Sequence, residues 1–96
     1  MHLAKAHNEK PSISPVLLPA GTDVLRLYGP SLAEEYLKGR FPYIALYDLY
    51  GHLLKTYEVK DFDWTGKTLM LNLPILKSGC CVLRVGEESL RFVVQP

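Results

Sequence analysis

Residues 68–73 read TLMLNL, and this stretch decides the fold because leucine returns at every second position. Successive side chains of a β-strand point to opposite faces, so Leu69, Leu71 and Leu73 are expected to face a hydrophobic core together. Pro74 follows directly, and a proline cannot donate a backbone hydrogen bond to a neighbouring strand. The stretch is therefore predicted to be a strand that has one buried face and ends before Pro74.

Six further segments are short apolar runs bounded by glycine, proline or polar residues. The predicted strands are residues 13–18, 23–28, 43–48, 53–59, 79–85 and 89–94. Their core-facing residues are expected to include Leu25, Leu27, Cys81, Leu83, Val85, Leu90, Phe92 and Val94. A single sheet with this many apolar faces would leave one of them uncovered, so two packed sheets are favoured. The predicted fold is all-β, an immunoglobulin-like antiparallel β-sandwich of about seven strands with one short helical turn.

Length and charge set bounds on the domain and its partners. The chain of 96 residues has room for one domain, predicted over residues 13–96, after a polar and loose N-terminal arm at residues 1–12. Eleven Lys and Arg against ten Asp and Glu give a net charge of +1, which does not indicate a nucleic-acid binder. Apolar runs such as residues 16–20 are shorter than the roughly 18–20 residues that a membrane-spanning helix needs.

Two segments interrupt the strand pattern. Residues 31–39 place apolar side chains at helical spacing, so a short helical turn is predicted, capped by Ser31 and ended by Gly39. Residues 60–67 are polar and predicted to be a loop, in which Trp64 folds back over the edge of the sandwich because burying its ring is favourable.

Two glycines are expected to hold structural turns. Residues 49–51 join the predicted strands 43–48 and 53–59 as a hairpin, and Gly51 can take a positive φ angle there without steric cost. Gly79 is expected to let the chain turn into the strand that it begins.

The sequence does not predict an enzyme, a cofactor or a metal site. Of three histidines, His2 and His7 fall in the arm and only His52 lies in the domain. No nucleophile elbow, phosphate-binding glycine loop or zinc-ligand spacing occurs. Asp61 and Asp63 are spaced to begin a Ca²⁺ site, but calcium takes about six to eight oxygen ligands, so a solvated turn is favoured.

The two cysteines, Cys80 and Cys81, are adjacent. A disulfide between neighbours closes a strained loop and removes almost no entropy from the unfolded chain, so none is expected. On a strand the two side chains point to opposite faces, and we expect Cys81 to pack inside. A redox switch between the neighbouring thiols is the alternative.

An exposed aromatic stripe is the candidate contact surface. Tyr43 and Tyr47 share the face of their strand that lies opposite Ile44 and Leu46, and Tyr57 is placed to lie beside them on the partner strand. Such a stripe serves contact with a protein or a cell-surface glycan. The alternative is that the cross-strand aromatic pairs only stabilise the sheet.

A pattern that resembles a known family runs through residues 43–54, 69–85 and 90–94. Its most specific elements are Tyr47-Asp48-x-x-Gly51 and a Gly79 six residues before Val85. The pattern resembles the C-terminal sorting domains of the Bacteroidetes type IX secretion system and related small secreted β-sandwich proteins. The resemblance implies a secreted or periplasmic location, and Ala4-Lys5-Ala6 has the A-x-A form of a secretory cleavage site, without an apolar stretch before it.

These observations predict a non-catalytic binding module. Where the family carries a tyrosine after its glycine this chain has Cys81, and it ends in Val94-Gln95-Pro96 without the family's lysine. A stand-alone binder is therefore expected ahead of a sorting-type domain. A structural accessory subunit that docks through its edge strands is a further alternative.

Overall fold

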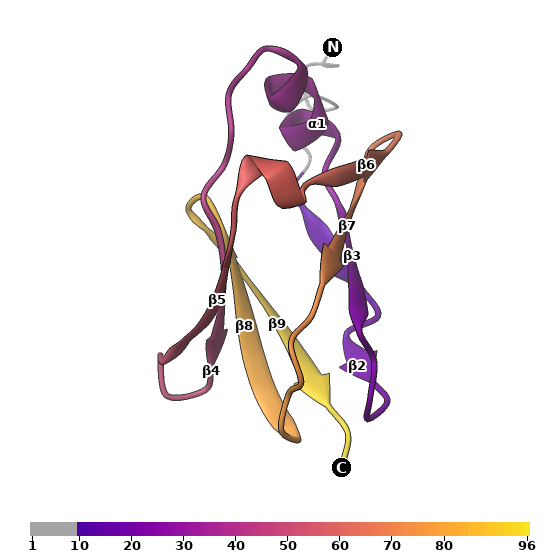
Figure 1. The fold of residues 1–96 in the computed structure, drawn as a ribbon, viewed down its shortest axis with the longest axis vertical. Coiled ribbons are helices and arrows are strands. Elements are labelled where there is room, and N and C mark those ends of the chain that lie inside the picture. Colours follow the sequence, from indigo (N-terminus) through magenta and orange to yellow (C-terminus); the bar gives the residue numbers. More distant parts are fainter. Residues whose placement is uncertain (1–9) are drawn as a thin grey trace, which may run out of the picture.

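Nine strands and one α-helix make up the part of the chain that the computed structural model describes, residues 10–96 (Figure 1). The strands are β1 (Ser12–Ser14), β2 (Leu17–Leu18), β3 (Val24–Tyr28), β4 (Ile44–Asp48), β5 (Leu53–Tyr57), β6 (Asp63–Thr65), β7 (Thr68–Asn72), β8 (Gly79–Val85) and β9 (Glu88–Val94). The helix is α1 (Pro30–Leu37), and a single 3₁₀ turn, η2 (Val59–Asp61), precedes β6. Most of the predicted arm, residues 1–9, lies outside the described residues.

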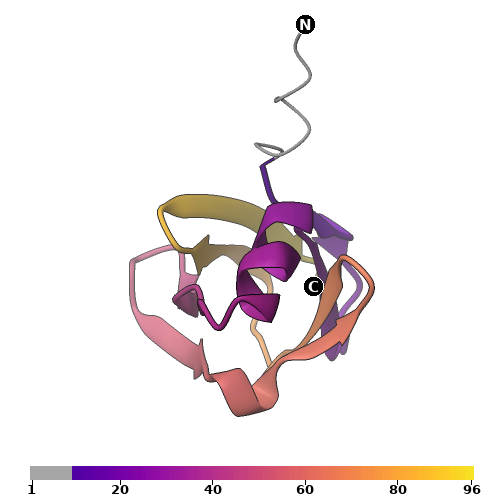
Figure 2. The same ribbon diagram turned by 90° about the horizontal axis from the view of Figure 1, so that it is seen from above.

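The strands form two sheets that pack together as a β-sandwich. The four-stranded sheet has the order β1-β3-β7-β6, and the five-stranded sheet has the order β2-β9-β8-β4-β5. All the paired strands are antiparallel except β2 and β9, which are parallel. Figure 2 shows the strands surrounding the core and α1 lying across one end. The predicted all-β sandwich is confirmed, while its immunoglobulin-like character stays a prediction.

Side chains from both sheets meet in one hydrophobic core. Its largest fully buried members are Leu18, Leu25, Leu27, Ile44, Leu46, Leu69, Leu71, Leu83 and Phe92. Full burial of a side chain of this size contributes about 1.5–3 kcal/mol, so this layer supplies most of the driving force for folding. The alternation predicted for residues 68–73 is confirmed, because Leu69, Leu71 and Leu73 are all buried.

Residues 13–18 are not the single strand that the sequence predicts. The chain leaves the four-stranded sheet after β1, which pairs with β3, and joins the five-stranded sheet as β2, which pairs with β9. Pro15 lies between the two strands, and the Ser14-Pro15 peptide bond is cis. Because a proline has no backbone N–H, it interrupts a ladder. The ladder resumes where the carbonyl of Val16 accepts a hydrogen bond from Val93 N at 2.9 Å.

Residues 60–67 are not the loop that their polarity predicts. They include the end of η2 and the whole of β6, which pairs with β7 so that Trp64 lies opposite Leu69. Trp64 packs against the core at the sandwich edge as predicted, and its ring centroid lies 5.7 Å from that of Tyr36 in α1. A three-residue strand is too short for its alternation to be recognised in sequence.

The helix lies where it is predicted, but a different residue caps it. α1 begins at Pro30 with Gly29 as the N-cap, so Ser31 is not the cap. Proline suits this position because its φ angle is already helical and its missing N–H would have no partner there. Gly39 follows the helix with φ +81° and donates its N–H to the carbonyl of Tyr36 at 3.0 Å, which confirms the predicted end.

Both predicted turn glycines have positive φ angles, +84° at Gly51 and +126° at Gly79. Gly51 donates its N–H to the carbonyl of Asp48 at 3.1 Å and closes the β4–β5 hairpin. Residues with a Cβ atom adopt such angles only with strain, so glycine is required at both turns.

Within residues 10–96, no helix is long and apolar enough to cross a membrane. The only α-helix described there, α1, has eight residues.

Candidate binding surface

The outward-pointing side chains of the five-stranded sheet form three cross-strand rows, two of which are largely apolar. Residues directly opposite each other on paired strands point to the same face of a sheet. One row runs through Leu17, Val93 and Cys80 on β2, β9 and β8. The next row runs from β9 to β5 through Arg91, Val82, Tyr47 and Leu53. A third row, through Ser89, Arg84, Ala45 and Thr56, is more polar. Most residues of these rows alternate along their strands with core residues, and Leu53 lies opposite Tyr47, so the rows point away from the core.

Most of this face is apolar and open to solvent. An antiparallel sheet with one face on the core usually presents polar side chains on the other. Here Leu17 is 52% exposed, Leu53 55% and Val93 39%. Cys80 and Val82 are half-buried between them. We call this set, with the two tyrosines described next, the outer apolar face: Leu17, Tyr43, Tyr47, Leu53, Cys80, Val82 and Val93.

Tyr43 and Tyr47 come together on this face, as the sequence predicts. Their hydroxyl groups lie 3.1 Å apart and share a hydrogen bond, and Tyr43 is 53% exposed. The hydrogen bond to Tyr47 raises the pKa of Tyr43, and Arg84 nearby acts in the opposite direction. Ala45, which lies between the two tyrosines in the strand, is fully covered. Their predicted role in partner contact stays a prediction.

Tyr57 is not part of the stripe, which corrects the predicted placement. It lies opposite Ile44 rather than Ala45, so it faces the core and is only 6% exposed. Its hydroxyl donates a hydrogen bond to the carbonyl of Asn72 at 2.6 Å, and burial raises its pKa to about 12. The Lys55 ammonium lies 5.0 Å from the centre of the ring. Tyr57 therefore ties β5 to the end of β7 and is not available to a partner.

The outer apolar face carries positive charge and no carboxylate. Arg84 lies opposite Ala45, and Arg91 lies opposite Val82, so both arginines share the face with the tyrosines. The only acidic residues of these five strands are Asp48 and Glu88. They lie opposite core-facing residues of β8 and therefore belong to the inner side.

The Asp48 side chain stabilises the β4–β5 hairpin by accepting hydrogen bonds within its turn. Its Oδ1 accepts hydrogen bonds from Tyr50 N and His52 N, both at 2.9 Å, and its Oδ2 lies 3.0 Å from Nδ1 of His52. The hydrogen bond from the His52 backbone is the main cause that lowers the pKa of the Asp48 carboxyl. The carboxylate thus satisfies the backbone of the turn that Gly51 closes.

Cys80 and Cys81 point to opposite faces of β8 as predicted, and both are free thiols. Cys81 is buried, and this burial raises the pKa of its thiol, with smaller contributions from Cys80 and Asp48. A thiol with a raised pKa is a poor nucleophile, because the thiolate is the reactive form. Cys80 is half-buried on the outer apolar face.

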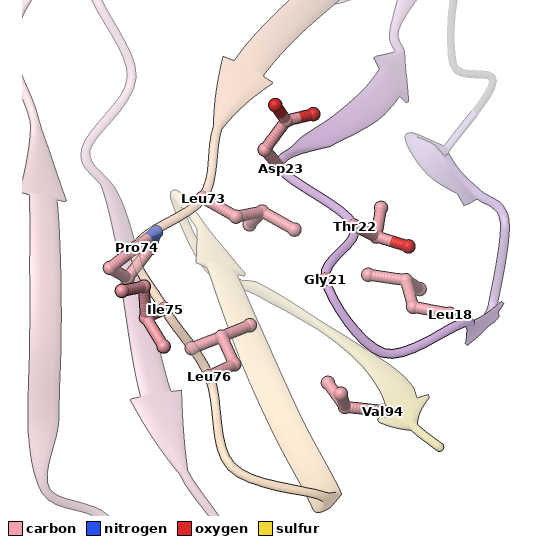
Figure 3. A pocket seen from close by; sticks show the side chains of 9 residues that line it. All are labelled: Leu18, Gly21, Thr22, Asp23, Leu73, Pro74, Ile75, Leu76 and Val94. Carbon is pink, nitrogen blue, oxygen red and sulfur yellow. The ribbon is translucent and has the colours of Figure 1, made fainter. Parts of the chain in front are cut away.

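Two hollows lie at the end of the sandwich that holds the C-terminus. In the smaller one, Leu18, Leu73, Leu76 and Val94 from three separate segments surround a space of about 110 Å³ (Figure 3). That volume is below the roughly 300 Å³ of a usual ligand pocket. The second hollow, of about 410 Å³, lies between the β4–β5 hairpin and residues 75–81. The fully exposed Ile75 lines both hollows.

Asp61 and Asp63 do not come together with further ligands. Oδ2 of Asp61 accepts the Glu58 N–H at 2.9 Å as part of the capping box of η2. Among the side chains of residues 10–96, no group of three His, Cys, Asp or Glu is arranged to hold a metal ion.

Sequence reasoning missed the four aliphatic members of the face, Leu17, Leu53, Val82 and Val93. Each lies on a different strand, and only the register of the sheet joins them. A signal was present, because Val82 and Val93 are apolar at the positions of their strands that should face water. No protein-family model, no curated protein and no solved structure matches the chain.

Proposed function

We propose that this chain is a non-catalytic binding module that holds another protein on its outer apolar face. The observation that carries the proposal is the pair of rows in which exposed or half-buried leucine, valine and tyrosine side chains from all five strands of one sheet point away from the core. Apolar surface exposed to water costs about 25 cal/mol per Å² relative to burial. A contiguous patch of this kind is typical of an interaction site.

A protein partner fits this surface better than a glycan. Leu17, Leu53 and Val93 offer flat aliphatic surface, which packs against the apolar side chains at the centre of a protein interface. A glycan would need polar groups and free aromatic faces. Tyr43 and Tyr47 are the only aromatic residues in the set, and their hydroxyls already bond to each other.

The sheet order supports an immunoglobulin-like version of the sandwich. The constant-type immunoglobulin domain has strands A, B, E and D in one sheet and C, F and G in the other. If β1, β3, β7 and β6 are taken as A, B, E and D, the four-stranded sheet has this order. With β4, β8 and β9 as C, F and G, the other sheet follows it too, and β5 extends that sheet beyond C. The outer apolar face would then be the outer side of the C-F-G sheet.

A secreted or periplasmic location is part of the proposal, and its support is the resemblance to the type IX sorting domains. The residues that carry it, Asp48 and Gly51, also build the β4–β5 hairpin. A sorting-type domain is the first alternative. The second is an accessory subunit that docks through β5, which is the longest edge strand of the sandwich and exposes Leu53 and Leu54.

Capture from a native extract with the tagged full chain tests the binding role. We expect the protein that the wild type retains to be lost when Tyr43→Ser and Tyr47→Ser are combined, because the change removes two rings without opening the core. Tyr28→Ser is the matched control, since Tyr28 is also an exposed tyrosine but lies on the four-stranded sheet. Unchanged capture by the double variant would contradict the proposal.

Two further variants separate the alternatives. If the partner docks along β5, Leu54→Lys should abolish capture while the double tyrosine variant retains it, because a charge on an edge strand opposes strand addition. If the chain is a sorting-type domain, residues 13–96 fused to an unrelated carrier should deliver that carrier to the surface of a bacterium with type IX secretion. We expect the carrier not to reach the cell surface.

A further inference from the structure

We propose that the partner presents carboxylate groups around an apolar centre, an inference that rests on the proposed function and names the chemistry of its ligand. The support is the position of Arg84 and Arg91 within the apolar rows. Arg91 continues the row of Val82 and Tyr47, and Arg84 lies opposite Ala45 between the two tyrosines. An occupant of the outer apolar face therefore lies against two guanidinium groups.

Neither guanidinium has a carboxylate partner among residues 10–96. The ion pairs found there join Lys38 and Arg40 to Glu35, and His52 to Asp48. Arg84 uses its Nε to donate a hydrogen bond to the carbonyl of Gly86 at 3.0 Å. That bond orients the side chain and involves neither of its terminal nitrogens.

Arginine is suited to this role because of its shape. Its planar guanidinium presents donors in a fork that matches both oxygens of a carboxylate. Arg40 already pairs with a carboxylate within the chain through one nitrogen, since its Nη1 lies 2.8 Å from Oε1 of Glu35. On the outer apolar face the corresponding acid is missing, and an acidic partner would supply it.

The same charges argue against a second copy of the chain as the occupant. Two copies packed through this face would bring four guanidinium groups, Arg84 and Arg91 of each copy, into one interface. The face offers no carboxylate to offset them, because Asp48 and Glu88 lie on the inner side. Like charges brought together in an interface are strongly unfavourable. A partner of opposite charge is therefore favoured over self-association.

Selection from a random peptide library displayed on phage, with the immobilised full chain as bait, tests the inference. We expect the retained peptides to combine Asp or Glu with large apolar residues. For a synthetic copy of the best peptide, changing both Arg84→Gln and Arg91→Gln should weaken binding about tenfold or more, and added salt should weaken it further. Arg26→Gln is the matched control, because Arg26 is exposed on the four-stranded sheet and should have no effect.

The outcomes separate this inference from the proposed function. Peptides that need Tyr43 and Tyr47 but lack acidic residues, or that bind the double glutamine variant equally well, would overturn the inference and leave the binding face intact. Failure to retain any peptide that depends on the two tyrosines would overturn both. Dimerisation of the wild type that the tyrosine changes abolish, measured by sedimentation, would replace the acidic partner with a second copy. A melting temperature equal to that of the wild type shows that the glutamine variants are folded.

Discussion

The two faces of the five-stranded sheet carry similar side chains in different surroundings. On the inner face, Leu83 and Phe92 are removed from water, packed against leucines of the other sheet. On the outer face, their chain neighbours Val82 and Val93 are also apolar but have no layer above them in residues 10–96. The free energy of folding therefore depends on the inner side chains. The apolar character of the outer ones needs another reason, and the proposed binding role would provide it.

The sharpest test of this contrast changes consecutive residues of β9. Phe92→Ala should lower the free energy of unfolding by about 3–5 kcal/mol, because it leaves a cavity in the core. Val93→Ala should change it by less than about 0.5 kcal/mol, because Val93 is on the outer face. Urea unfolding of both variants measures the difference. If both variants lost the same free energy of unfolding, the outer apolar face would be covered by other residues of the chain and would not be a free surface.

The adjacent cysteines repeat the test with a smaller change. Cys81→Ser should destabilise the chain by about 1–3 kcal/mol, because it places a hydroxyl in the core without a hydrogen-bond partner. Cys80→Ser replaces a half-buried thiol on the outer face and should be nearly neutral. Thermal melts of the two variants compare them. A larger decrease in melting temperature for Cys80→Ser would mean that Cys80, and not Cys81, faces the core.

The β4–β5 hairpin decides which residues of β5 belong to each face, so its turn is the next point to perturb. Gly51→Val should cost about 1–2 kcal/mol, because a branched side chain is strained at a φ angle of +84°. Tyr50→Val is the control at the neighbouring exposed position and should be almost neutral. If the two variants melt at the same temperature, the turn is not held as described.

The smallest expected change in stability concerns Tyr57, which faces the core, and Tyr43, which lies on the outer apolar face. Tyr57→Phe should cost about 1 kcal/mol at neutral pH through the lost hydrogen bond to Asn72, whereas Tyr43→Phe should cost less. The pKa of Tyr57 is raised to about 12 by burial, so its contribution is complete below pH 10 and is lost as the pH rises toward 12. Between pH 10 and pH 12, the free energy of unfolding of Tyr57→Phe should therefore fall less steeply than that of the wild type. Denaturant unfolding at a series of pH values measures both. If the two free energies of unfolding fell in parallel, the Tyr57 hydroxyl would be exposed to solvent.

Sequence alone could predict the elements whose pattern is local. Leucine at every second position identified β7, and Gly51 identified the hairpin. The facing of Tyr57 could not be predicted, because the register of β4 and β5 shifts between Leu46 and Tyr47 and breaks simple alternation. The transfer of the chain between sheets at Pro15 depends on both sheets together. The proposed binding surface is formed by the same long-range register. Its tyrosines could therefore be found in the sequence, but its cross-strand rows could not.

The most direct test of the binding surface uses Cys80 as a built-in probe. Its half-buried thiol lies within the outer apolar face, whereas Cys81 is buried and serves as the internal control. Alkylation of the native full chain by iodoacetamide is followed by mass spectrometry, alone and with a saturating amount of the captured partner. If the partner covers the outer apolar face, Cys80 should react severalfold more slowly in the complex while Cys81 stays unmodified. An unchanged rate of Cys80 alkylation under saturation would contradict the assignment of this face as the binding surface.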